Sequence, residues 1–195
     1  MASEKKSICP GCKIVLPYKE ELQHYQTVGI ARYGVVSPEC SFIFLEVLNN
    51  ERELFGYPPA HRLIVDAYAV QHPPHAEIQT KLKIDKRLVD ASIQSISIHL
   101  LALHCSMVKK MELRSIAKIM DTILSNMARD KAPFELLTPP ENLGDIKVID
   151  IETQMLEKNL DLNDYTALAY SWAESSWMAW KAHHETIKKL YDKYA

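Results

Sequence analysis

The chain has 195 residues, of which 47% are hydrophobic and 25% charged, and its formal net charge at pH 7 is −2. These values are ordinary for one soluble globular protein, and the net charge gives no reason to expect the basic face that nucleic acid usually demands, so we expect no nucleic-acid partner. No apolar run approaches the roughly 20 residues that span a bilayer, and the amino terminus lacks the apolar segment of a secretory signal. We therefore expect a cytoplasmic protein with no membrane contact.

Helical periodicity dominates the sequence. Glycine is scarce, with 5 residues, and β-hairpin signals are absent, whereas long stretches repeat their apolar residues at the helical period. The sequence predicts an all-α protein, with an up-and-down helical bundle over residues 37–195. We expect residues 1–36 to form an irregular metal-knuckle arm packed on the bundle, in which Tyr18–Tyr25 is suited to two helical turns.

The arm begins with a cysteine knuckle, Cys9-Pro10-Gly11-Cys12. Its Pro-Gly centre bends the backbone so that both thiolates can face one ion. In a chain without secretory features, a C-x-x-C pair indicates metal binding or redox chemistry more than a disulfide framework. The competing interpretation is two exposed thiols in an unstructured arm.

Ser37-Pro38-Glu39 is typical of a helix start, with a serine N-cap, proline at the first position and an acid in the first turn. We expect this helix to end near Leu54, before the sequence GYPP. Cys40 falls in its first turn, where the helix dipole and free amides favour a thiolate.

The stretch His61–Pro74, HRLIVDAYAVQHPP, concentrates the polar chemistry of the chain. At helical period, His61, Val65, Tyr68 and His72 lie on one stripe. The two prolines stop the helix, so His72 lies at its carboxyl end.

Further helices are expected at about 85–110 and 112–129, after Asp150, and at about 163–191, the longest. His99 takes a core-facing position in the first of these, and His183 lies late in the last. The last helix also carries three tryptophans, which we expect in the core: Trp172, Trp177 and Trp180.

A first metal site follows from antiparallel packing of consecutive helices. His61 and His72 are about 16 Å apart on one helix and cannot share an ion. Cys40 and His72 then lie at the same end of the bundle, and the knuckle can fold back to them. Three thiolates and an imidazole make a tetrahedral zinc site. The ligands predicted are Cys9, Cys12 and Cys40, with His72 as the fourth and His24 as its rival.

A second cluster is predicted at the opposite end of the bundle. Its members would be His61, His99 and His183. Asp66 would orient or deprotonate a ligand there, and Tyr68 would be a proton-transfer partner. The competing interpretation is three separate histidines, each bonded to a neighbouring carboxylate or hydroxyl.

These motifs resemble an uncharacterised bacterial domain-of-unknown-function family with a CPGC knuckle, a later S-P-x-C, a VDAYAxQHP block, an H-L pair and a closing WxxWxxHH. This chain supplies them at Cys9–Cys12, Ser37–Cys40, His61–Pro73, His99-Leu100 and Trp177 to His184. The resemblance implies a shared fold and a shared metal site, and it implies no activity. A looser likeness, at fold level only, is to DinB/YfiT-like bundles, in which three histidines hold a metal and some members are thiol transferases or hydrolases.

Three hypotheses result. The first is a metal-binding protein in which a structural zinc clamps the arm to the bundle. The second is a metal-dependent hydrolase or thiol transferase that uses the histidine cluster, with Asp66 or Tyr68 transferring protons. The third is a ligand-sensing or interaction module, which predicts an exposed apolar patch among the three tryptophans. The sequence leaves open a small-molecule ligand and a homo-oligomer.

Overall fold

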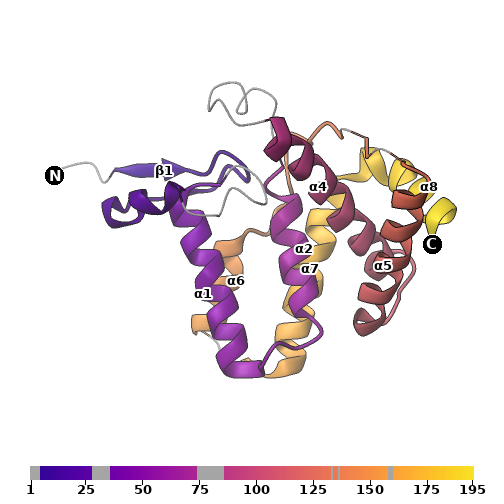
Figure 1. The fold of residues 1–195 in the computed structure, drawn as a ribbon. Helices are drawn as coiled ribbons and strands as arrows, with labels where there is room; N and C mark the ends of the chain where they lie inside the picture. Colours follow the sequence, from indigo (N-terminus) through magenta and orange to yellow (C-terminus); the bar gives the residue numbers. More distant parts are fainter. Residues whose placement is uncertain (1–4, 28–35, 74–85, 133, 136, 158–159) are drawn as a thin grey trace.

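The computed structural model describes residues 5–27, 36–73, 86–132, 134–135, 137–157 and 160–195 (Figure 1). The elements in chain order are β1 (Lys6–Ile8), β2 (Val15–Pro17), η1 (Glu20–Thr27), α1 (Pro38–Phe55), α2 (His61–Val70), α4 (Lys86–Met107), α5 (Leu113–Arg129), α6 (Val148–Glu157), α7 (Leu162–Ala179), η3 (Lys181–His183) and α8 (His184–Tyr194). The fold is predominantly helical, which confirms the all-α prediction. None of the described helices combines the length and the apolar content needed to cross a bilayer.

Helix α1 begins and ends where its sequence signals place it. The Ser37 hydroxyl accepts the Cys40 amide at 3.2 Å, and proline occupies the first turn. Gly56 ends the helix in the left-handed conformation, with φ 63°, and its amide donates to the Arg52 carbonyl at 3.0 Å. This local chemistry fixes Cys40 at the amino end of the helix.

Helices α1 and α2 are joined at the lower end in Figure 1, with α6 packed on α1 and α7 packed on α2. On the other side of α2 lies α4, which also packs on α5, α7 and α8. Helix α7 runs parallel to α2. The Tyr165 hydroxyl near its start bonds Glu51 beside the α1–α2 junction, whereas the indole of Trp180, just past its end, donates to the Val70 carbonyl at 3.1 Å.

The core lies where α2, α4 and α7 meet. Its largest side chains less than 2% exposed include Trp172, Trp180, Tyr165, Leu63 and Leu101. Trp177, at 4% exposed, is buried as well. The three tryptophans therefore form no exposed apolar patch, so the surface that the interaction-module hypothesis requires is absent from them.

Two parts of the chain differ from the expected secondary structure. The arm is not wholly irregular, because β1 and β2 pair as an antiparallel hairpin with Ser7 opposite Leu16, followed by the 3₁₀ helix η1. The expected last helix is interrupted at Trp180–His183, between α7 and α8. No proline or glycine marks that break; the Trp180 indole is instead held by a carbonyl of α2.

Candidate metal centre

The hairpin turn presents the cysteine knuckle. The Cys9 amide donates to the Ile14 carbonyl at 2.9 Å, and the Lys13 amide donates to the Cys9 carbonyl at 3.0 Å. Lys13 takes the left-handed conformation, with φ 64°, which closes the turn. Because the strands on both sides are paired, the backbone between them is held in a loop that turns both thiols inward, with Cys9 0% and Cys12 3% exposed.

The other two donors come from helix ends that meet the knuckle. Cys40 lies in the first turn of α1, and His72 follows the carboxyl end of α2. The imidazole of His72 donates from Nδ1 to the Tyr68 carbonyl at 2.7 Å, which leaves Nε2 facing Cys40 Sγ at 3.3 Å. A backbone acceptor on one ring nitrogen is the usual way in which a protein orients a metal-binding histidine.

These four side chains fit one tetrahedral ion. The ligand atoms of Cys9, Cys12, Cys40 and His72 all lie within 4.8 Å of one another, and all four residues are buried. Cys12 Sγ and Cys40 Sγ are 3.8 Å apart. An ion bound tetrahedrally at about 2.3 Å from each sulfur requires sulfur–sulfur separations of about 3.8 Å. The donors are therefore spaced as a zinc-type centre needs them.

Metal binding at this cluster is connected to the release of protons. Hydrogen bonds from Cys12 and Cys40 lower the pKa of Cys9, whereas hydrogen bonds to Cys12 and Cys9 raise the pKa of Cys40. Burial opposes a charge on His72, but its hydrogen bonds to Cys12 and Cys9 raise its pKa to about 10. Without an ion the imidazole thus keeps a proton that a metal would displace.

Two neighbouring residues support the ligands. The Tyr68 hydroxyl lies 4.0 Å from Cys40 Sγ, and its ring stacks on Phe44 with centroids 3.7 Å apart. Glu39, 2% exposed, accepts hydrogen bonds from Ser7 Oγ at 2.7 Å, from the Lys19 amide at 3.2 Å and from Gln23 Nε2 at 2.7 Å. Glu39 therefore fastens the hairpin and η1 to the helix that carries Cys40.

The three histidines predicted as a second cluster lie apart, each with its own partner. His61 Nδ1 bonds Glu51, His99 Nδ1 donates to Asp66 at 2.7 Å, and His183 Nε2 donates to the Thr138 carbonyl at 2.8 Å. The placement of His183 follows from the direction of α7, which ends near the His72 end of α2. Among the described residues, one group of three or more potential ligands lies close enough together to share an ion, and it is the cysteine–histidine cluster.

The two residues predicted to transfer protons, Asp66 and Tyr68, lie at different sites. Asp66 is 2% exposed and bonds both His99 and Arg62. The Arg62 Nε lies 3.2 Å from Asp66 Oδ2. Tyr68 lies at the cysteine site, beside Cys40, and not among the histidines. The side chain of His24, the rival fourth ligand, is outside the described residues.

Sequence reasoning missed a buried acidic contact at the opposite end of α1. Glu51, 0% exposed, accepts the Tyr165 hydroxyl at 2.7 Å and bonds His61. The bond to Glu51 raises the pKa of His61, with burial opposing it. Glu51 stands among polar neighbours, Asn49, Asn50, Arg52 and Glu53, so no sequence signal singles it out as buried.

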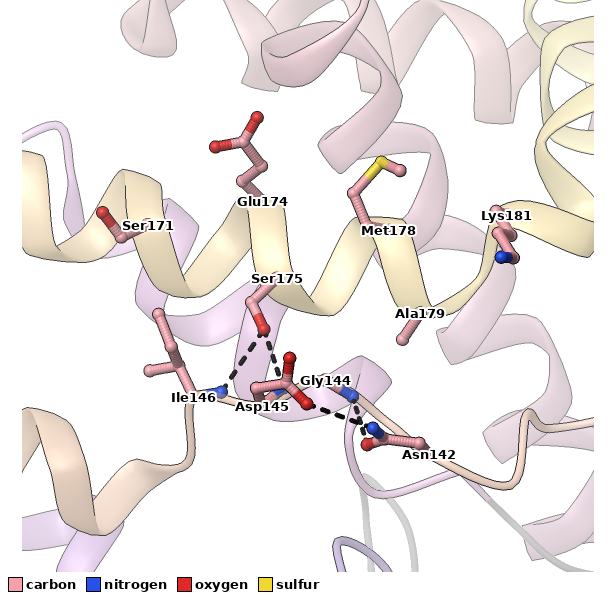
Figure 2. A pocket seen from close by; sticks show the side chains of 10 residues that line it. All are labelled: Asn142, Gly144, Asp145, Ile146, Ser171, Glu174, Ser175, Met178, Ala179 and Lys181. Carbon is pink, nitrogen blue, oxygen red and sulfur yellow. Dashed lines mark hydrogen bonds between the residues drawn. The ribbon is translucent and has the colours of Figure 1, made fainter.

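A cavity of ≈ 580 Å³ opens between α7 and the loop at 142–146 (Figure 2). Its central hydroxyl, Ser175 Oγ, already accepts the amides of Asp145 at 2.9 Å and Ile146 at 3.3 Å. Gly144 has φ +102°, and a Cβ there would come within 2.9 Å of Ser175 Oγ. The polar groups at this wall hold the loop against α7, so they serve the fold.

Comparison with known proteins places the chain in a family. It belongs to the family described as "Family of unknown function (DUF5946)", which matches residues 7–181 and so includes all four cluster ligands. No curated protein and no solved structure matches the chain.

Proposed function

We propose that this member of a family of unknown function binds one structural zinc ion, which fastens the amino-terminal hairpin to the helical bundle. The observation that carries the proposal is the convergence of Cys9, Cys12, Cys40 and His72 within 4.8 Å. The ligands come from the hairpin, the start of α1 and the end of α2. One ion would therefore connect three segments of the chain at a single point, beside the hydrogen bonds that Glu39 accepts from Ser7 and Gln23.

The choice of zinc follows from the donors. Three thiolates and one imidazole are soft to borderline ligands, and a tetrahedral set of this kind selects zinc over magnesium or calcium. Thiolate ligands persist where thiols stay reduced, so we also propose a cytoplasmic location.

A structural role is supported by the number and burial of the ligands. A catalytic zinc keeps one position for water or substrate, whereas four protein ligands close the coordination sphere. In the described residues, the histidines that a metal-dependent hydrolase or thiol transferase would use are each bonded to a separate partner.

The test is metal analysis of protein purified with reductant and without chelator. We expect one zinc per chain. Removal of the ion with a strong chelator should expose the amides of Lys6–Pro17 to hydrogen exchange, because the knuckle loses its bond to α1 and α2. Bundle amides in α5, far from the ligands, provide the internal control. A chain with no bound metal, or a hairpin equally protected after zinc removal, would contradict the proposal.

A further inference from the structure

His104 is a buried histidine that the metal centre does not use. It lies on α4 at the packing surface with α7 and α8, and it is 2% exposed. Neither ring nitrogen has a hydrogen-bond partner among the described residues. Its ring centroid lies 5.8 Å from Trp177 and 5.2 Å from Tyr191. The imidazole is thus held between two aromatic rings, an environment that favours its neutral form.

The charged groups around His104 disfavour its protonation. The ionisable groups that act on it are Lys109, two residues past the end of α4, and Lys188 and His184 on α8. The acid nearby is Asp192, also on α8. Asp192 already pairs with Lys109 at 3.4 Å and with Lys188 at 3.9 Å. Burial, reinforced by Lys109, lowers the pKa of His104 to about 4.

Helix α8 is short, and few of its side chains are fully buried. It has 11 residues, of which Ile187 and Tyr194 are buried. Asn126 Nδ2 donates to the Tyr194 carbonyl at 2.9 Å, and the His184 ring stacks on Trp177 with centroids 3.8 Å apart. A helix this short has little stability of its own, so its docking is the step most easily reversed.

We propose that protonation of His104 releases α8 from α4 and α7, so that the carboxyl-terminal helix opens in mildly acidic conditions. The ring cannot gain a proton while it is enclosed without a partner or a counter-charge. Opening exposes the ring to water, where it takes up a proton with the ordinary pKa of histidine.

The direction of the pH effect follows from the two states. Above about pH 6.5, the ordinary pKa of histidine, His104 is neutral whether α8 is docked or open, so it does not affect the equilibrium. Below that pH the open form binds a proton and the docked form does not, so opening increases as pH falls towards about 4. At pH 5 the difference amounts to an increase in the open population of up to about 30-fold.

The experiment is hydrogen exchange of full-length, zinc-loaded protein at pH 7.5 and pH 5.0, corrected for the intrinsic exchange rate. We expect α8 amides of the wild type to lose protection by about 10- to 30-fold at pH 5.0, and those of His104→Leu to lose none. His184→Gln is the matched control, since it removes the neighbouring imidazole and should keep the wild-type response. Equal loss of protection in wild type and His104→Leu would overturn the proposal, as would loss of the response in His184→Gln alone.

Two further measurements keep the proposal testable if the leucine variant folds poorly. His104→Phe retains a ring between Trp177 and Tyr191 and should also lose the pH response. In the wild type, NMR titration should find the His104 imidazole neutral in the docked state down to pH 5. A His104 that titrates near 6.5 while α8 stays protected would show that the helix tolerates the charge, and the proposal would be wrong.

Discussion

Replacement of Cys40 by alanine is expected to abolish zinc binding and to cause the largest loss of stability of any single substitution at the centre. Cys40 is the ligand that joins the knuckle to the bundle, with its Sγ 3.8 Å from Cys12 and 3.3 Å from His72 Nε2. An ion present at 1,000 times its dissociation constant stabilises the folded state by about 4 kcal/mol. We therefore expect the free energy of unfolding to fall by at least about 4 kcal/mol, measured by denaturant titration with zinc present.

Cys105→Ala is the matched control. Cys105 is also 0% exposed and also lies on a helix, but it is outside the cluster. Burial raises its pKa to about 11, so it is a neutral thiol. Its replacement should cost about 1–2 kcal/mol of packing and leave one zinc per chain. If the two alanine variants keep the same zinc content, Cys40 is not a ligand.

Replacement of Gln71 by leucine is expected to have the second largest effect, a loss of about 2–4 kcal/mol in the free energy of unfolding. Gln71 is 1% exposed, and its amide makes three hydrogen bonds. It donates to the carbonyls of Leu143 at 2.9 Å and Ile146 at 2.7 Å, and it accepts the Trp172 indole at 3.2 Å. Leucine would remove the partner of the buried Trp172 indole and of the Leu143 and Ile146 carbonyls, and we expect a lower melting temperature in thermal unfolding.

Thr122→Val provides the comparison for Gln71. The Thr122 hydroxyl also bonds a carbonyl, that of Lys118 at 3.1 Å, but this contact is solvent-exposed. Water can replace such bonds, so we expect a loss below about 1 kcal/mol. A Gln71→Leu variant no less stable than Thr122→Val would show that the loop at 142–146 does not depend on the buried amide.

The cysteine centre could be predicted because its determinants are local. The Ser37-Pro38 cap places Cys40 in a first turn, and the prolines after His72 end α2 at that residue. A short connection between the two helices then brings both donors to one end. Local signals do not fix the position of the knuckle. We inferred it from the expectation that its two thiolates share one ion with Cys40 and His72.

The relative positions of the other histidines could not be predicted, because they depend on the path of the chain. His61 and His99 lie on helices as expected, whereas His183 lies in η3, where the expected last helix is interrupted. The distance of His183 from the other two follows from α7 running parallel to α2, a direction that the bonds of Tyr165 to Glu51 and of Trp180 to the Val70 carbonyl reflect. No local pattern reports such contacts.

The hairpin was missed for a different reason. Each strand has three residues, too short for a period-two pattern to be recognised, and the cysteine knuckle replaces the usual turn dipeptides. The break before α8 was missed because the apolar stripe continues from Trp172 to Ile187 across it.

X-ray absorption at the zinc edge of the purified, reduced protein tests the central claim most directly. We expect three sulfur ligands at about 2.3 Å and one nitrogen at about 2.0 Å, with no oxygen ligand. That result would match Cys9, Cys12, Cys40 and His72 as a closed structural set. A site with fewer than three sulfurs, or with a bound water oxygen, would contradict it and favour an open centre.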